Sequence, residues 1–386
     1  MKIISSAAPI SIASLVGLSS ARVDQSDGKC DYMFVECEAV CEFTCMNRPD
    51  VVELEPLAHH PEVLSAIPWS NISEEELLQV DRSLHKPKLL GLLREASEDK
   101  SYSPPVYPRT DYLRLRFADY GRLGLEDPGL FSWSCFDHCK YECMHLVEKR
   151  RRVLPSPRKY FGKWPFRRVY ICQEILSSAY SLLNGLPYIL FSLTHTFRTH
   201  TPFIYRVFTL IVSLMWISST IFHCRDTPLT MYLDYFTAFG GVVANCATGL
   251  HQSILVRFDS RTRMGVIGLL FVLWVFHSMY LTLINFDFEW NMTLAVAIAL
   301  LGGVFWVVFY ARNRRKKPHA WMVVPATWGL FPLLVAFELN DFPPGPNGLA
   351  DAHSYWHLST VPFSVMWVLF MFKESQWPKP IQKHLD

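Results

Sequence analysis

Apolar runs long enough to cross a lipid bilayer dominate the second half of the chain. Residues 169–372 contain runs of about 17–25 apolar residues, the length that a membrane-spanning helix needs. The chain has 386 residues, 50% of them hydrophobic, and much of its charge and proline lies before residue 169. We therefore predict an all-α membrane protein. Basic residues gather only in short loops, which argues against a nucleic-acid-binding protein.

The apolar runs predict seven transmembrane helices, at residues 169–193, 203–223, 232–256, 264–284, 292–310, 321–339 and 353–372. Basic residues concentrate in the connections 194–202, 257–263 and 311–320 and in the tail. The connections 224–231, 285–291 and 340–352 are mainly acidic. Because basic loops stay on the cytosolic side of a membrane, we expect the acidic connections to face the lumen.

The N-terminus has the pattern of a secretory signal peptide. Lys2 precedes an apolar stretch from Ala7 to Leu18, and the small residues Ser19, Ser20 and Ala21 follow. The predicted organisation is a signal peptide over residues 1–21, a lumenal cysteine-rich segment over 22–168, a seven-helix membrane domain over 169–372 and a cytosolic tail over 373–386.

The lumenal segment contains seven of the ten cysteines, which predicts disulfide bonds in an oxidising compartment. Six of them form two groups with four-residue spacing: Cys37, Cys41, Cys45, Cys135, Cys139 and Cys143. Because this spacing places side chains on one face of a helix, we predict two short helices joined by disulfides. A zinc site is the alternative, although zinc-binding cysteines more often occur as C-x2-C. Cys30 is left over.

A linker from Arg48 to Thr110, rich in proline and charge, separates the two cysteine groups. It contains the sequon Asn71-Ile72-Ser73, and we predict glycosylation of Asn71 if the segment is lumenal.

Polar residues gather at the predicted lumenal ends of three spans. Ser219 and His223 end the second span, Asp234 begins the third, and His353 and His357 begin the seventh. Ionisable residues inside membrane helices are costly and usually functional. Two histidines at i and i+4 with a third from another helix can bind zinc and leave one coordination position for water. We predict a metal centre here; the alternative is histidines that only hydrogen-bond at the membrane interface.

Four other histidines lack the spacing of the predicted metal ligands, and we do not expect them to bind metal. His251 and His277 lie inside spans without a partner at helical spacing, and we expect them to pack or hydrogen-bond. His138 and His145 lie in the cysteine-rich segment, where we expect surface positions.

The elements S-x3-H, a following aspartate and a late H-x3-H resemble a superfamily of membrane hydrolases that includes alkaline ceramidases and adiponectin receptors. The chain is more closely similar to the post-GPI-attachment-to-proteins factor three family, the phospholipases that remodel GPI-anchor lipids. The segments that carry this resemblance are FSWSCFDHCKYECMH (131–145), FGKWPFRRVYICQE (161–174), STIFHCRDTPLTMYLDYF (219–236), INFDFEWNM (284–292) and LNDFPPGPNGLADAHSYWHLSTVP (339–362). The chain departs from the family in its long linker and at Ile175-Leu176, where the family has Pro-Ala.

The resemblance implies removal of the sn-2 fatty acid from the phosphatidylinositol of GPI-anchored proteins, which gives a lyso-GPI. His223, His353 and His357 would ligate Zn²⁺, Asp234 would act as general base, and Ser219 would hydrogen-bond the water or the oxyanion. Candidates for supporting the metal ligands or binding the glycan are Asp226, Asp287, Asn291, Glu338 and Asp351. The alternative for each, which fits equally well, is a loop residue that only contacts water. The substrates would be GPI-anchored proteins in the endoplasmic reticulum membrane or, alternatively, the Golgi membrane.

Two other functions fit the same residues. One is a different lipid amidase or esterase such as a ceramidase, which the cysteine-rich segment argues against. The other is a receptor or a metal-handling factor without catalysis, for which Asp234 would be dispensable while the histidines would not.

Overall fold

The computed structural model describes Phe34, residues 133–150 and residues 157–378. The chain divides into two units, one of residues Ala21–Ile171 and one that contains Cys172–Asp386 together with Met1–Ser20. The predicted signal peptide, the glycosylation site Asn71 and the first cysteine group (Cys37, Cys41 and Cys45) lie outside the described residues and stay predictions.

In the first unit, α6 (Cys135–Arg150) carries the second cysteine group on one helix. The Ser134 hydroxyl accepts a hydrogen bond from the Asp137 backbone N–H (3.1 Å) and donates one to the Asp137 carboxylate (2.8 Å), which fixes the start of α6. Cys139 and Cys143 are fully buried and form disulfide bonds. The pairing of all six cysteines stays a prediction.

The expectation of a surface position for His138 was wrong, because its side chain is only 1% exposed. The guanidinium of Arg168 lies between the rings of Trp133 and Tyr141, at 3.5 and 4.1 Å from their centroids, and its Nη1 lies 3.2 Å from His138 Nδ1. Burial, followed by the charge of Arg168, lowers the pKa of His138 to about 4. His145 is half-buried, with Nε2 2.9 Å from the Phe166 carbonyl.

The second unit is a bundle of long helices. They are α7 (Ile175–Ser192), α9 (Phe203–Cys224), α10 (Pro228–Ser253), α11 (Ser260–Leu283), α12 (Phe288–Asn313) and α15 (Ala352–Gln376). A composite segment precedes α15 and consists of η6 (Ala320–Met322), α13 (Val323–Trp328), α14 (Leu330–Leu333) and η7 (Leu334–Glu338). Short elements, α8 (His195–Thr199) and η5 (Leu255–Arg257), lie in the connections.

Five of these segments are long and apolar enough to cross a membrane: α9, α11, α12, the composite segment and α15. This identifies a membrane protein. The helices α7 and α10 are not among these five, and α7 buries the polar side chains of Ser177, Ser181 and Asn184. The predicted count of seven spans therefore stays a prediction.

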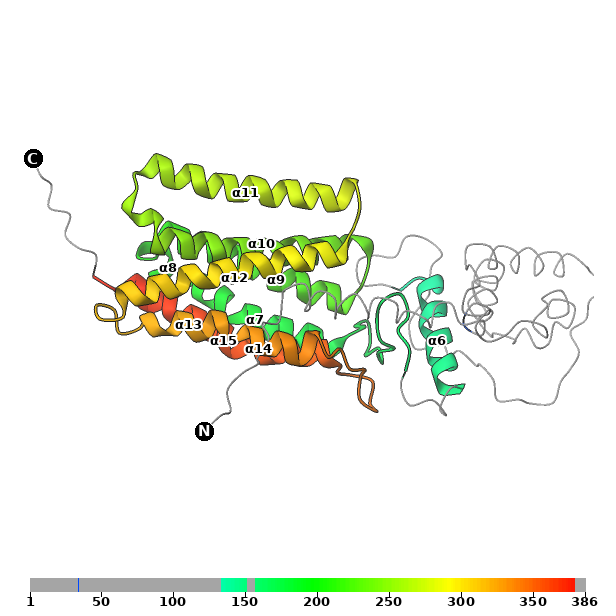
Figure 1. Cartoon of the computed structure of the whole chain (residues 1–386). Coiled ribbons are helices and arrows are strands. Elements are labelled where there is room, and N and C mark those ends of the chain that lie inside the picture. The colour runs from blue at the N-terminus through cyan, green and yellow to red at the C-terminus, as the bar shows by residue number, and fades with distance from the viewer. Residues whose placement is uncertain (1–33, 35–132, 151–156, 379–386) are drawn as a thin grey trace, which may run out of the picture. The chain divides into compact units, whose positions relative to one another are not determined.

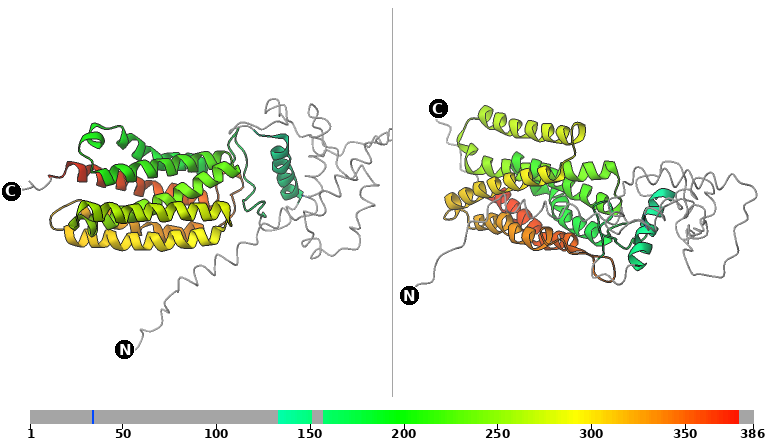
Figure 2. Two further views of the ribbon diagram at one scale, coloured as in Figure 1. Left: turned by 90° about the horizontal axis from the view of Figure 1, so that it is seen from above. Right: turned by 45° about the vertical axis from the view of Figure 1, so that its right-hand side comes forward.

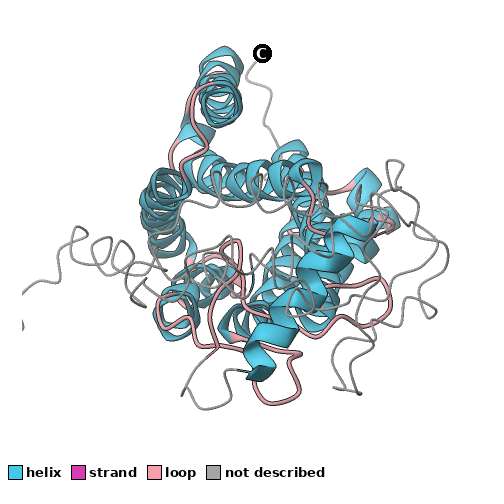
Figure 3. Cartoon of the chain, turned by 90° about the vertical axis from the view of Figure 1, so that its right-hand side faces the viewer, coloured by secondary structure: helices cyan, strands magenta, loops and turns pink. Residues whose placement is uncertain are grey.

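The long helices lie alongside one another (Figure 1) and form a ring when the bundle is seen end-on (Figure 3). Going round it, α7 packs on α9, α9 on α10, α10 on α12, α12 on α13, α13 on α15, and α15 again on α7. Helix α11 lies outside the ring (Figures 2 and 3) and packs mainly on α10. Most of its apolar side chains are exposed. An exposed apolar helix suits contact with lipid.

The two ends of the ring differ in chemistry. We call the end where α9 and α10 meet and α15 begins the histidine end, because it contains His223, His353 and His357. We call the other the opposite end; it buries an aromatic core that includes Trp306, Trp367 and Phe370. At the opposite end Glu374 forms an ion pair with Lys317 (2.7 Å) and lies 2.8 Å from Nε2 of His319. Because α15 rises ~1.5 Å per residue, His353 and Glu374 lie roughly 30 Å apart along it.

Candidate metal centre

The helix ends that carry the three histidines are fixed by local hydrogen bonds. Thr227 and Thr230 form a capping box at the start of α10, where Pro228 occupies the first turn, and this ends the short connection after α9. Asp351 caps α15: one oxygen of its carboxylate accepts hydrogen bonds from the Ser354 backbone N–H and hydroxyl, both at 2.8 Å. Burial raises the pKa of the Asp351 carboxyl.

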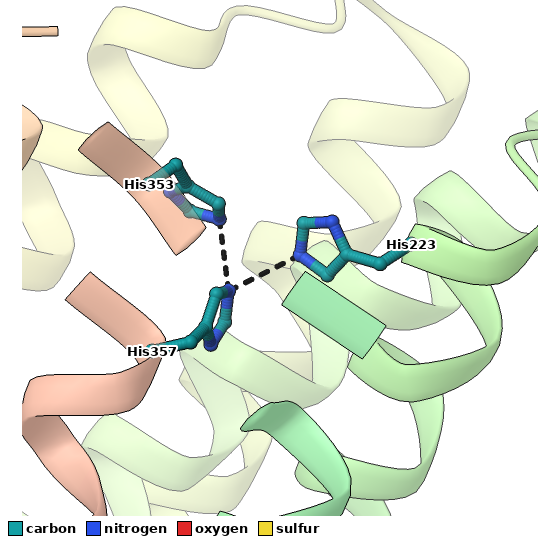
Figure 4. Close-up of side chains that lie close together, drawn as sticks. All are labelled: His223, His353 and His357. Atoms are coloured by element: carbon teal, nitrogen blue, oxygen red, sulfur yellow. Dashed lines mark hydrogen bonds between the residues drawn. The ribbon is translucent and has the colours of Figure 1, made fainter. Parts of the chain in front are cut away.

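His223, His353 and His357 converge on one point (Figure 4). His223 lies in the last turn of α9, and the other two lie one turn apart at the start of α15. The Nε2 atom of His357 lies 3.1 Å from Nε2 of His223 and 2.9 Å from Nε2 of His353 (Figure 4). One ring nitrogen from each of the three lies within 4.8 Å of the others.

The other ring nitrogen of each histidine faces away from this point and has its own partner. His223 Nδ1 lies 2.7 Å from a carboxylate oxygen of Glu174, and His353 Nδ1 lies 2.6 Å from one of Glu338. His357 Nδ1 lies 3.4 Å from the hydroxyl of Ser181. An Nδ1–H that donates outward leaves Nε2 with a lone pair.

Three Nε2 lone pairs that face one another repel unless a cation lies between them. Ligand nitrogens about 2.0–2.1 Å from a tetrahedral zinc ion lie roughly 3.3 Å from one another, close to the separations of His357 Nε2 from its two neighbours. An outward hydrogen bond to carboxylate is also typical of a histidine that binds metal. The donor set therefore fits a divalent metal ion such as zinc.

Glu174 and Glu338 are not equivalent. Glu174 and His223 are buried, with side chains 5% and 4% exposed, whereas Glu338 and His353 are 20% and 39% exposed. Glu174 is also held through its backbone, because its N–H donates to the His223 carbonyl at 3.0 Å. The more buried pair should orient its histidine more strongly, because water competes less there.

Ser219 is buried at this end, and its hydroxyl lies 3.1 Å from that of Ser181. Ser181 donates to the Ser177 carbonyl at 2.9 Å, which leaves its oxygen to accept from Ser219 and from His357. Ser219 is thus linked to the histidines through Ser181.

Asp234 lies half-buried in the second turn of α10. Among the described residues, the group of mutually close ligand atoms consists of the three histidines and does not include Asp234.

Three other residues that the sequence suggested for supporting the ligands or binding the glycan make contacts of their own. Asp287 caps α12 by accepting from the Trp290 backbone N–H at 2.9 Å. Asn291 is buried and pairs with Nε2 of His277 at 2.9 Å, which gives His277 the hydrogen bond expected of it. The carbonyl of Asp226 accepts from Arg225 at 3.0 Å.

Three residues of this site are absent from the sequence-based prediction: Glu174, Ser181 and Asn184. Ser177, Ser181 and Asn184 recur at helical spacing along α7, which is a signal for a polar face on an apolar helix. Asn184 donates to the carbonyl of His357 at 2.7 Å and so holds the turn that carries this histidine.

Comparisons with known proteins identify the family. Residues 128–375 match the Per1-like family. The chain is 34% identical to the GPI-specific phospholipase A2-like PGAP3 of Cricetulus griseus, with 64% of this chain and 78% of that protein covered. It is 35% identical to the Protein PER1 homolog of Schizosaccharomyces pombe, with 64% and 76% covered. No solved structure matches. The chain belongs to the Per1-like family.

Proposed function

We propose that the protein remodels GPI anchors by hydrolysing the sn-2 acyl ester of their phosphatidylinositol, with a zinc ion held by His223, His353 and His357. The convergence of three Nε2 atoms, each on a ring with an outward partner, carries this proposal. The relatives support the substrate class, because several are named GPI-specific phospholipase A2-like.

When bound, zinc supplies Lewis acidity and lowers the pKa of a water molecule to near neutrality. Glu174 and Glu338 keep Nδ1–H of their histidines pointing outward, so that each Nε2 stays a ligand. Asp234, on the helix after His223, takes the proton of the attacking water at its carboxylate. Ser219 turns its hydroxyl hydrogen from Ser181 to the developing oxyanion of the ester.

The histidine end faces the lumen in this proposal. Its connections contain Asp226, Asp287, Asp341 and Asp351, whereas those of the opposite end contain Arg257, Arg314, Arg315 and Lys316. Such a charge difference supports a cytosolic position for the basic end. GPI anchors occupy the lumenal leaflet, so that an ester at the membrane surface can reach the histidines while the glycan stays in water. The compartment is the endoplasmic reticulum or the Golgi.

Lipid analysis of GPI anchors tests this function. In cells whose only copy carries His357→Ala or Asp234→Asn, we expect anchors to retain the unsaturated sn-2 chain. His200→Ala removes an exposed histidine at the opposite end and should give normal anchors. Normal anchor lipids in both site variants would refute the proposal. A defect in His357→Ala alone would favour a metal-handling factor or a receptor over a hydrolase.

A further inference from the structure

Two cysteines of the membrane unit lie together beside the metal centre. Cys172 is two residues before Glu174, and Cys224 directly follows His223. The side chains of Cys172 and Cys224 lie close enough to interact, because the N–H of the residue after Cys172 binds the Cys224 carbonyl. Cys172 is buried, and Cys224 is half-buried. Both belong to the unit that contains residues 172–386, so that their contact is internal to it.

The backbone holds these two cysteines in register. The Gln173 N–H donates to the Cys224 carbonyl at 2.9 Å, and the Glu174 N–H donates to the His223 carbonyl at 3.0 Å. Residues 172–174 therefore run along the last turn of α9. The two thiols therefore lie in the same short contact between residues 172–174 and the end of α9 as the hydrogen bond from His223 Nδ1 to Glu174.

We propose that Cys172 and Cys224 form a disulfide bond that fastens the segment before α7 to the end of α9 and thereby holds Glu174 against His223. The proposal rests on the lumenal placement of the histidine end proposed above, because disulfides persist in oxidising compartments. It does not depend on which lipid the protein acts on. Cys246, the other free cysteine of the described residues, is buried within α10 and gives a matched control.

The bond forms by thiol–disulfide exchange with a dithiol oxidoreductase in its disulfide form. The Cys224 thiolate, the more exposed of the two, attacks one sulfur of the oxidant and releases its second sulfur as a thiol. Cys172 then attacks the Cys224 sulfur and expels the oxidant's first sulfur. One disulfide forms, the oxidant's disulfide becomes two thiols, and two electrons and two protons pass to the oxidant.

Peptide mapping of the full-length protein, purified from membranes, tests the bond itself. Free thiols are blocked with iodoacetamide in denaturant without reductant, and the digest is analysed by mass spectrometry. We expect a linked pair of peptides containing Cys172 and Cys224, and alkylation at Cys246. Alkylation of both Cys172 and Cys224 would overturn the proposal. This measurement needs neither metal nor lipid, so that it is independent of the proposed hydrolysis.

Zinc titration of Cys172→Ser, Cys224→Ser and the double variant tests the positioning role. Each single variant should lose about tenfold in zinc affinity. This is the lower limit of the 10–100-fold loss that is typical when a group that orients a metal ligand is removed. The double variant should lose no more than either single variant, because both break the same bond. Cys246→Ala should bind zinc as the unaltered protein does. Unchanged affinity in both single variants, or additive losses in the double variant, would overturn the role.

Discussion

The two ends of the bundle use the same pair of side chains, histidine and glutamate, for different purposes. At the histidine end, Glu174 and Glu338 each bind one histidine, and the free nitrogens of those rings point at a third histidine. At the opposite end, Glu374 binds His319 and also the ammonium of Lys317, which balances its charge within the cluster. A buried histidine–carboxylate pair is therefore not evidence of a metal site. A metal site is indicated instead by the convergence of the remaining ring nitrogens on one point.

The strongest test of this contrast removes one histidine from each end. His357→Ala takes away the ring that both other histidines face, and we expect the purified protein to retain no stoichiometric zinc. His319→Ala breaks a contact with Glu374 and should leave the zinc content unchanged, because no other imidazole of the described residues is recorded at hydrogen-bond distance from its Nε2. Elemental analysis of both purified variants gives the comparison, and equal zinc contents would contradict it.

The carboxylates give a smaller, graded effect. Glu174→Gln should lower zinc affinity by about 10–100-fold, because the amide no longer fixes the tautomer of His223. Glu338→Gln should lower it less, because this carboxylate and His353 are more exposed to water. Competition with a chelator of known affinity measures both losses. A larger loss for Glu338→Gln would show that burial does not set the strength of this support.

Glu374→Gln should affect stability and leave zinc affinity alone. The substitution leaves Lys317 and His319 without their carboxylate, and breaking such a buried pair costs about 3 kcal/mol. Lys373→Gln, at an exposed neighbouring position, should change stability by less than about 0.5 kcal/mol. Thermal unfolding in detergent measures both. A fall in zinc affinity with Glu374→Gln would mean that the two ends are coupled through α15.

The smallest expected effect concerns the cap of α15. Asp351→Ala removes the side chain that accepts from Ser354 and should cost about 1 kcal/mol of stability, with a loss of zinc affinity below that of Glu174→Gln. Asp351→Asn keeps a good cap and should stay close to the unaltered protein. If Asn fails as Ala does, the negative charge of Asp351, rather than the cap, matters at this end.

The sequence was informative where a single helix carries the signal. The spacing of His353 and His357, the place of His223 at the end of an apolar run and the charge of the connections together predicted that the three rings meet. Glu174 could not be found in this way, because it contacts a histidine 49 residues away and no local periodicity links the two. The role of Asp234 as a base stays a prediction.

Helix irregularities were likewise invisible to an analysis of apolar runs. The predicted sixth span, 321–339, is a composite of short helical elements rather than one helix. Pro332 lies within it and has no backbone N–H to donate to the preceding turn, which helps to explain the break in regular α-helix. Only the length and polarity of this segment, and not its internal geometry, follow from its composition.

The wide turn η7 has a consequence for how the helix before the metal centre tolerates a change in its length. Its last residue is Glu338, and the backbone closes through an i to i+5 hydrogen bond from Leu339 N–H to the Leu334 carbonyl at 3.1 Å. A π-turn of this kind holds one residue more than an α-turn. Deleting one residue from 335–337 would restore an α-helical turn closed by the same hydrogen bond between Leu339 and Leu334, so that Glu338 would keep its direction toward His353. A one-codon deletion or insertion at this turn can thus change the length of the chain without disconnecting the carboxylate that supports the metal ligand.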